Sequence, residues 1–328
     1  MLRIGVIGAG RIAQIAHLAT LSTVREARIV ALADLRLDLA ALVAERWNVP
    51  ALYSSHAELL ADPGVDAVVV VTQRNQTAGI ARDALRAGKH VLTEKPMALS
   101  SADARELVAL AGEKQVCYAV GYMKRHDRGV NAARALIAGW RATGRAGKLL
   151  LVRATMDGGD DGAGADWLMT QEPRTDAGFV VGDAIGDPTP KSPFDQFLNV
   201  FSHTINLARF LTGGSIVLEA AVHGERSAAL AGRIADVPFL GAFEDRVVPG
   251  WHERIEVIFE CGRVSVALPP GGASNDTALS AAEMQPNSSA GRPAELLAST
   301  PTTWPFEASF ALRERAPVTF GSRCNACT

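Results

Sequence analysis

The first third of the chain alternates short apolar runs with segments of helical periodicity, and no other feature constrains the fold as strongly. The apolar runs predict strands, and the segments between them predict helices. Such alternation is typical of βαβ units, whose parallel strands, joined by right-handed crossovers, form a doubly wound sheet covered by helices. The predicted strands are Arg3–Ile7, Ala27–Ala33, Val65–Val71, Val91–Thr93 and Val116–Val120, and the predicted helices are Arg11–Leu21, Leu37–Trp47, Asn75–Ala87 and Ser101–Glu113.

Beyond Gly121 the pattern changes to one helix and several half-apolar strands. In the last two strands, apolar residues alternate with polar ones across a Cys261-Gly262 turn, which indicates a hairpin in an antiparallel sheet with one solvated or interface face. We therefore predict an α/β domain over 1–121 and an α+β domain over 122–328 with a mostly antiparallel open sheet. Its predicted elements are the helix Arg128–Ile137 and the strands Leu149–Met156, Ile216–Val222, Arg254–Glu260 and Arg263–Leu268.

Two stretches of the second domain have little periodicity. Gly158–Pro190 is rich in Gly and Asp and predicts loops around a site. Pro269–Thr303 is rich in Ala, Ser, Pro and Gly and predicts a long, mobile connection.

Length and charge exclude several classes of protein. A chain of 328 residues can form two domains with buried cores. Its net charge of -2 argues against a nucleic-acid binder held by a large basic surface. No apolar run reaches the roughly 20 residues that a membrane span requires. The N-terminus leads straight into the first strand without the shape of a cleavable signal, so we expect a cytoplasmic protein with no membrane partner.

The cysteines suggest neither a disulfide framework nor a metal centre. They are too few and too scattered for the former. A zinc site at the C-terminal C-x-x-C would need two further ligands, and no His, Asp or Glu cluster has ligand spacing, so we expect reduced thiols and no metal. The four are Cys117, Cys261, Cys324 and Cys327.

A glycine-rich loop follows the first predicted strand. Gly8-Ala9-Gly10-Arg11-Ile12-Ala13 fits G-x-G-x-x-A, with a strand before it and a helix after it. Gly8 permits the tight turn, Gly10 lets the backbone approach a pyrophosphate, and Ala13 allows close packing of helix on strand. The N–H groups at the start of the following helix, at Arg11 and Ile12, point their positive dipole end toward the phosphates. The loop therefore predicts a bound dinucleotide.

The end of the second predicted strand carries an acid. The carboxylate of Asp34 can accept hydrogen bonds from the adenosine ribose hydroxyls and would repel a 2′-phosphate, which favours NAD. Arg36 could instead pair with a 2′-phosphate, so NADP stays open. Asp34 could also serve only as a cap for the helix Leu37–Trp47.

The third predicted strand ends in Thr72 and Gln73. Ligands of open α/β sheets bind beyond the carboxyl ends of the strands, so both residues should lie close to the coenzyme. Arg74 could contact its phosphates or a substrate, or be solvated.

A lysine follows the fourth predicted strand in Glu94-Lys95-Pro96. The proline restricts the backbone of Lys95 to extended conformations, which would help to aim its side chain. Beside a nicotinamide, this lysine could accept a hydroxyl proton during oxidation or donate one during reduction. A solvated surface lysine is the alternative.

The segment Phe194–Leu211 is apolar nearly all round, which predicts a buried helix. Asn199, His203 and Asn206 nevertheless form one polar stripe on one face. Buried polar groups need partners or line a cavity. We interpret the stripe as one wall of a substrate site, although a histidine satisfied within the core is the alternative.

The order of these motifs resembles that of one known family. The glycine loop, Asp34, Glu94-Lys95-Pro96 and the His203 helix occur in the order found in the Gfo/Idh/MocA oxidoreductases, and the resemblance runs to about residue 270. It implies an N-terminal Rossmann domain and a C-terminal open antiparallel sheet. It also implies hydride transfer between NAD(P) and a sugar or cyclitol. Many members assemble through that sheet, which implies a homodimer or homotetramer.

The resemblance also implies roles for particular residues. Lys95 and His203 would be the catalytic pair that contacts the reacting hydroxyl, and Glu94 would lie near the nicotinamide. Arg125 stands where relatives have a substrate-side arginine. Asn199 replaces an aspartate that the family often has four residues before its histidine, and an amide can orient a hydroxyl but cannot take its proton.

Two further departures concern longer segments. The T-P-N-x-x-H that is common after the third strand is here Thr72-Gln73-Arg74-Asn75-Gln76-Thr77, and the tail Ala311–Thr328 lacks the usual closing helix.

The sequence therefore predicts an NAD(P)-dependent oxidoreductase of a secondary hydroxyl or ketone on a polyhydroxy substrate. Two other hypotheses remain. The chain could bind NAD(P) and a sugar only to regulate a partner, or it could reduce a non-sugar carbonyl or imine.

Overall fold

The structure is a computed structural model that describes residues 1–158, 166–173, 193–246, 250–268, 279–284 and 295–297. The chain divides into two compact units. The first contains Met1–Gly121 together with the described residues 166–173, and the second contains 122–158 and the described residues from 193 to 297. The predicted loop regions lie largely outside the described residues, as does the whole C-terminal tail.

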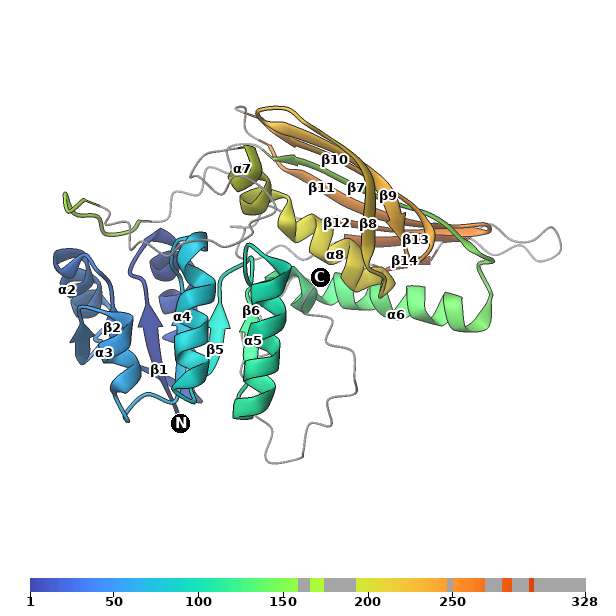
Figure 1. The fold of residues 1–328 in the computed structure, drawn as a ribbon. Coiled ribbons are helices and arrows are strands. Elements are labelled where there is room, and N and C mark those ends of the chain that lie inside the picture. Colours follow the sequence, from blue (N-terminus) through green and yellow to red (C-terminus); the bar gives the residue numbers. More distant parts are fainter. Residues whose placement is uncertain (159–165, 174–192, 247–249, 269–278, 285–294, 298–328) are drawn as a thin grey trace. The chain divides into compact units, whose positions relative to one another are not determined.

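The first unit is built on a six-stranded parallel sheet with strand order β3-β2-β1-β4-β5-β6 (Figure 1). The order reverses between β1 and β4, and ligands of such sheets bind beyond the carboxyl ends of the strands at that point. The doubly wound fold predicted from the alternation is confirmed. The strands are β1 (Leu2–Ile7), β2 (Ala27–Ala33), β3 (Ala51–Tyr53), β4 (Ala67–Val70), β5 (His90–Thr93) and β6 (Tyr118–Val120).

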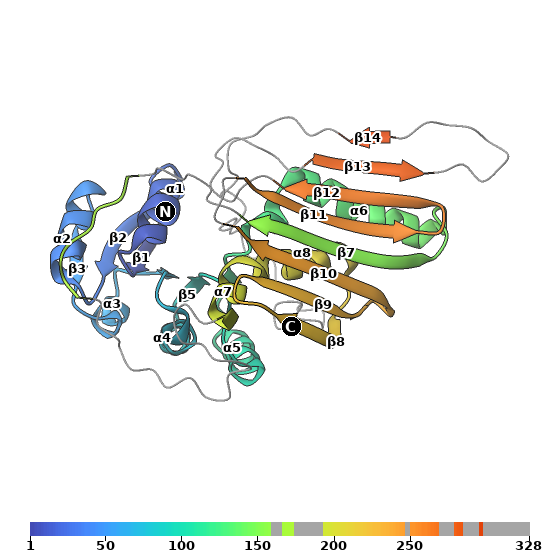
Figure 2. The ribbon, with the colours of Figure 1, turned by 90° about the horizontal axis from the view of Figure 1, so that it is seen from above.

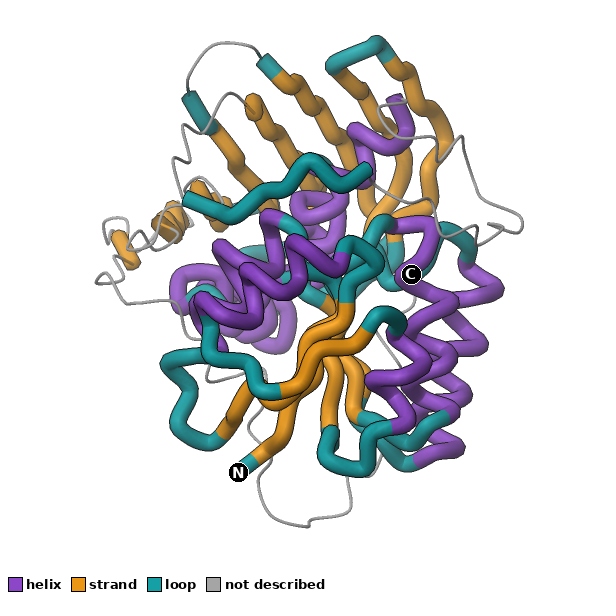
Figure 3. The backbone as a smooth tube through the Cα atoms, turned by 90° about the vertical axis from the view of Figure 1, so that its left-hand side faces the viewer, coloured by secondary structure: helices purple, strands orange, loops and turns teal. Residues whose placement is uncertain are grey.

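Helices cover both faces of this sheet (Figure 3). On one face, Leu18 and Val43 pack with Val69 in one core cluster, and on the other, Leu85 packs with Val68 in a second. Neighbouring β4 residues therefore contribute to opposite cores, which explains why the strand is apolar throughout. The helices are η1 (Ala13–Leu18, with π-helical hydrogen bonding) continuing as α1 (Ala19–Leu21), α2 (Leu37–Arg46), α3 (His56–Ala61), α4 (Arg74–Arg86) and α5 (Ser101–Lys114).

The second unit contains an eight-stranded sheet of order β14-β13-β12-β11-β7-β10-β9-β8 (Figure 2). Neighbouring strands are antiparallel except β7 and β10, which run parallel. The elements are η2 (Met123–His126), α6 (Arg128–Thr143), β7 (Leu149–Gly158), α7 (Pro193–Val200), α8 (Ser202–Thr212), β8 (Ile216–His223), β9 (Ser227–Ile234), β10 (Val237–Asp245), β11 (His252–Phe259), β12 (Gly262–Leu268), β13 (Leu279–Met284) and β14 (Glu295–Leu297).

Helices α6 and α8 cover one face of this sheet (Figure 1). Trp140 of α6 and Leu207 of α8 share a core cluster with Val257 and Phe259 of β11, and the Trp140 and Phe259 rings meet edge to face at 5.4 Å. The other face carries exposed apolar side chains on β8, among them Val217 and Val222. The apolar side chains of the predicted hairpin, formed by β11 and β12, are therefore buried in this core, whereas most side chains of β8 are exposed to solvent.

Several elements carry no clear signal in the sequence. β9 has alanine on both faces, so it shows no alternation between apolar and polar residues, and β10 contains Pro238 and Gly241. The two strands join through Ala235 and Asp236, both with positive φ (49° and 66°), where glycine is the usual residue. β13 and β14 lie within the stretch expected to be a long connection.

The predicted helix Phe194–Leu211 is divided into α7 and α8. The ring of Phe201, at the break, stacks on Phe243 of β10 with a centroid distance of 4.9 Å and also meets Phe197 edge to face. Only α8 is strongly buried, so the expectation of one continuous buried helix is wrong for its N-terminal half. The break therefore lies at the residue that contacts the sheet.

The alternation along β10 predicts contrasting effects of two adjacent substitutions. Phe239 is fully buried, whereas Leu240 points to the other face and is 44% exposed. Phe239→Ala should lower the free energy of unfolding by about 3–5 kcal/mol through loss of packing. Leu240→Ala should change it by less than about 1 kcal/mol. The midpoint and slope of urea unfolding measure both effects, and equal shifts would contradict this register.

The ion pair between Arg3 and Asp66, at the start of the parallel sheet, predicts that the stability of the protein depends on pH. Arg3 donates from Nη2 to Asp66 Oδ1 at 2.6 Å and from its backbone and Nε to Oδ2, and these bonds lower the pKa of Asp66 to about 2. A carboxylate with a lowered pKa stabilises the fold above its unfolded pKa, and this contribution disappears as the pH falls through the folded value.

Unfolding measured from pH 5 to pH 2 should therefore show a loss of stability that Asp66→Asn reduces. The matched control is Glu113→Gln, which removes an exposed pair with Lys114 and should leave the profile unchanged. Identical profiles for Asp66→Asn and the unchanged protein would contradict the linkage.

Candidate functional site

The two glycines of the loop after β1 are needed for different reasons. Gly8 has φ +103°, and a Cβ there would lie 2.2 Å from the carbonyl oxygen of Val71, at the end of β4. A Cβ on Gly10 would have no protein atom within 4 Å. Gly8 is therefore required by the fold, whereas the open space at Gly10 is what a closely approaching pyrophosphate needs.

Asp34 connects the end of β2 to this loop. Its Oδ2 accepts a hydrogen bond from the backbone N–H of Ala9 at 2.7 Å. Arg36 donates to the same carboxylate from its backbone N and from its guanidinium, the closest ion-pair contact being Nε to Oδ1 at 3.2 Å. Arg36 is itself the N-cap position of α2, without a side-chain cap bond, so Asp34 is not the cap of that helix.

The remaining predicted coenzyme residues surround the loop. The Oγ1 of Thr72 is buried and has no hydrogen-bond partner among the described residues, so it can receive one from a ligand. Gln73 is exposed at the N-cap of α4, and Ile12 is 41% exposed at the start of η1. Open space, a buried hydroxyl without a partner and an apolar surface together fit a dinucleotide.

Residues 166–173 lie along the first unit, and we call this segment the strap. Trp167 packs under the guanidinium of Arg11 at 5.0 Å, and the Leu168 backbone exchanges two hydrogen bonds with the amide of Gln14. Glu172 accepts hydrogen bonds from the backbone at the start of α2. Nothing in the local sequence signals these contacts, because the partners lie far apart along the chain.

The acid beside the predicted lysine has a partner that the sequence does not reveal. Nε2 of His17, on the buried side of η1, lies 2.8 Å from Oε1 of Glu94, and Oε2 of Glu94 accepts from the backbone N of Lys95. Burial alone would raise the pKa of Glu94, but the hydrogen bond and charge of His17, together with Lys95, lower it below its ordinary value. Glu94 is therefore held as a carboxylate, with the half-buried Lys95 following it at a cis peptide to Pro96.

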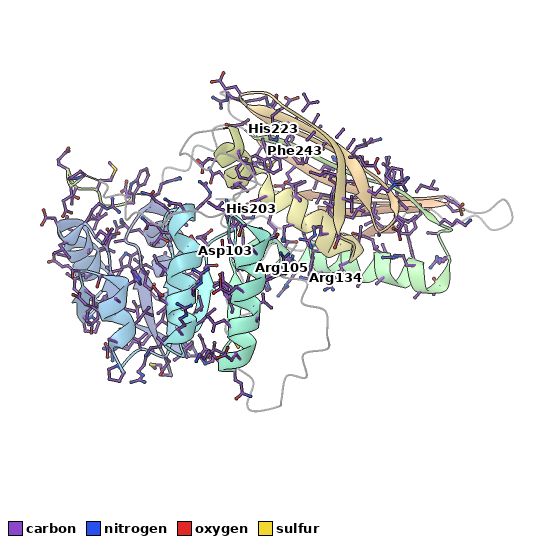
Figure 4. The ribbon with its side chains drawn as sticks, in the orientation of Figure 1. Asp103, Arg105, Arg134, His203, His223 and Phe243 are labelled. Atoms are coloured by element: carbon purple, nitrogen blue, oxygen red, sulfur yellow. The ribbon has the colours of Figure 1, made fainter. Side chains whose placement is uncertain are left out.

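The predicted residues of the second unit gather around the start of α8, which carries His203 (Figure 4). The ring of Tyr122 meets that of His203 edge to face, with centroids 5.9 Å apart. Nε of Arg125 donates to Oδ1 of Asn206 at 2.7 Å, and its guanidinium lies over the rings of Tyr122 and Phe210. Burial, with nearby Arg209 and Arg134, lowers the pKa of Arg125.

The polar stripe predicted on this helix is thus divided in function. Asn206 is buried and fixes Arg125, whereas Asn199 is exposed on α7 and His203 is half-buried. Asn206 therefore positions Arg125, and contact of His203 and Asn199 with a substrate stays a prediction.

A second polar cluster lies next to His203 and was not anticipated. Thr204 donates to Oε1 of the fully buried Glu253 at 2.7 Å, and Lys124 forms an ion pair with the other oxygen. Lys124 also lies over the ring of Trp251 at 5.4 Å. A buried carboxylate needs such partners, and this cluster fixes η2 and α8 to β11.

Among the described residues, no group of three or more His, Cys, Asp or Glu side chains could hold a metal ion. In the same part of the chain, no helix has both the length and the apolar character that crossing a membrane requires.

The contrast between the two glycines gives a testable prediction. Gly8→Ala should destabilise the first unit, since its Cβ would collide with the backbone of Val71, directly after β4. Gly10→Ala should leave the urea midpoint unchanged and weaken NAD binding about tenfold or more, because the methyl group occupies the space for the pyrophosphate. Isothermal titration calorimetry measures the affinity, and unchanged NAD binding by Gly10→Ala would contradict this placement of the coenzyme.

Comparisons with known proteins agree with this geometry. A family model described as an oxidoreductase family with an NAD-binding Rossmann fold matches residues 2–122. Inositol 2-dehydrogenase 1 of Saccharopolyspora erythraea is 31% identical over 284 residues, covering 81% of this chain and 74% of that protein. Myo-inositol 2-dehydrogenase of Thermotoga maritima is 27% identical over 283 residues, covering 80% and 74%.

Solved structures share the fold. The scyllo-inositol dehydrogenase of Lactobacillus casei, with bound NAD(H) and scyllo-inositol, superposes with a TM-score of 0.65 at 19% identity, covering 82% of this chain and 77% of that one. GenD2 of gentamicin A biosynthesis, in complex with NAD, gives 0.66 at 23% identity, covering 84% and 74%. Since the likeness to the 31% identical relative covers 81% of this chain and extends well beyond the first unit, the chain belongs to the Gfo/Idh/MocA family of NAD(P)-dependent oxidoreductases.

Proposed function

We propose that the protein transfers a hydride between NAD and a secondary hydroxyl or ketone on a cyclitol or sugar. The observation that carries this proposal is the likeness to inositol 2-dehydrogenases across both units, at 31% identity over 284 residues. Three mammalian relatives that match a shorter part of the chain are trans-1,2-dihydrobenzene-1,2-diol dehydrogenases. Inositols and that diol share adjacent hydroxyl-bearing carbons on a six-membered ring, which is the substrate class we propose.

Lys95 is the group that we propose to move the proton. When bound, the coenzyme supplies the hydride acceptor of the oxidation, and the hydroxyl that is oxidised must lose its proton to a base. Lys95 follows β5 at the carboxyl edge of the sheet, where ligands of this fold bind. The Glu94 carboxylate, held by His17, accepts a hydrogen bond from the backbone N of Lys95 and so helps to fix the backbone from which the lysine side chain projects.

In the second unit, we propose that His203 and Asn199 bind the substrate hydroxyls. A half-buried imidazole can donate or accept a hydrogen bond, and an amide can do both at once. Because Asn199 is neutral, it can orient a hydroxyl but cannot stabilise a protonated His203. Arg125, bonded to Asn206 and stacked on aromatic rings, acts in this proposal mainly to position η2 against α8.

We also propose that the protein forms a homodimer or homotetramer through the open face of the second sheet. The exposed apolar side chains Val217 and Val222 of β8 support this proposal, because a second copy would remove them from water. Sedimentation or light scattering tests it.

Substitution of Lys95 tests the enzymatic proposal. Lys95→Ala should lower kcat by about 10²–10⁴-fold while NAD binding stays within about twofold, since the lysine acts on the proton rather than on the coenzyme. Turnover is measured as nicotinamide absorbance at saturating NAD during a screen of cyclitols and sugars. The matched control is Lys114→Ala, at the far end of α5, which should change neither quantity.

Retained turnover of Lys95→Ala would contradict its role in the reaction. If the unchanged protein binds NAD but turns over none of the polyols, the regulatory alternative gains support over the enzymatic one.

A further inference from the structure

The N-terminus of α2 is capped by a side chain from a distant part of the sequence. Oε1 of Glu172 accepts from the backbone N of Asp38 at 3.2 Å, and Oε2 accepts from that of Leu39 at 3.0 Å. The first turn of a helix leaves such N–H groups without partners and attracts anions. Here both donors are taken by one carboxylate of the strap.

This cap lies next to the acid that would bind the adenosine ribose. Asp34 follows β2 directly, Arg36 bonds to it, and α2 begins at Leu37. Partial burial raises the pKa of Glu172, but the hydrogen bonds from Leu39 and Asp38 and, to a smaller extent, the charge of Arg36 together lower it below its ordinary value. Arg36 is thus close to two carboxylates, Asp34 and Glu172.

The strap that carries Glu172 is itself fixed at several points. Leu168 donates to Oε1 of the buried Gln14 at 2.8 Å, and Trp167 packs against Arg11. Thr170 donates from Oγ1 to Oε2 of Glu172 at 3.2 Å. The carboxylate is therefore held in position by its own segment as well as by α2.

NADP differs from NAD by a phosphate on the adenosine 2′-oxygen, the atom beside the acid at the end of β2. A phosphate there would need nearby donors, and this chain offers two kinds, the guanidinium of Arg36 and the N–H groups of α2. Asp34 already pairs with the guanidinium of Arg36, and Glu172 already accepts hydrogen bonds from the N–H groups of α2.

We propose that Glu172 is a specificity-determining residue that makes the protein select NAD over NADP. It denies the 2′-phosphate the donors at the N-terminus of α2 and adds a second negative charge beside Asp34. The inference rests on coenzyme binding at the glycine loop, and it assigns to the strap a role in coenzyme choice.

The test compares coenzyme affinities in variants of the full chain. Isothermal titration calorimetry gives Kd for NAD and for NADP with the unchanged protein, Glu172→Ala, Glu172→Gln and the control Gln171→Ala, which alters an exposed neighbour on the same strap. The ratio of the two Kd values is the readout, since any loosening of the strap affects both coenzymes.

We expect the unchanged protein to bind NAD more tightly than NADP. Both Glu172 variants should shift the ratio about tenfold toward NADP, because each removes the charge and Glu172→Ala also frees the donors of α2. Gln171→Ala should leave the ratio unchanged.

Equal affinity of the unchanged protein for both coenzymes would overturn the proposal. So would an unaltered ratio in both Glu172 variants. The proposed function can fail separately, because a protein without polyol turnover still yields both binding constants.

Discussion

The bond between the carboxylate of Asp34 and the backbone of Ala9 is the interaction on which the arrangement of the first unit depends. It joins the end of β2 to the loop after β1, while Gly8 brings that loop into contact with the end of β4. Three strand ends therefore meet at the point where the strand order reverses. A coenzyme site at this edge requires all three strand ends. Gly8 lets the loop pack against the backbone after β4, and Gly10 leaves free the space that the pyrophosphate needs.

Local pattern was sufficient to predict most of this unit. Each of three features can be recognised from a few consecutive residues: the all-apolar β4, the G-x-G-x-x-A loop and the acid after β2. The contacts of His17 with Glu94 and of Glu172 with α2 could not be predicted in this way, since each joins residues that only the folded chain brings together. The signal available for His17 was a lone polar residue on the buried side of a helix, which more often indicates a satisfied core histidine.

The second unit was harder to predict for a physical reason. Its sheet uses alanine-rich β9 and a β10 interrupted by proline and glycine, so neither strand shows a period of two in hydrophobicity. The polar stripe on the predicted helix was a real feature, but Asn206 is engaged by Arg125 from η2 rather than facing a ligand. Periodicity can place a polar residue on a face, yet it cannot say which distant side chain will meet it there.

Three carboxylates in the first unit are held in the same manner. Asp34 accepts from the glycine loop and Arg36, Glu94 from His17 and the Lys95 backbone, and Glu172 from the first turn of α2. Each is oriented by donors that are already in place, so it can meet a ligand without further rearrangement. The placement of these charges decides what the site accepts, since hydroxyl groups can donate to such carboxylates whereas a further phosphate would be repelled.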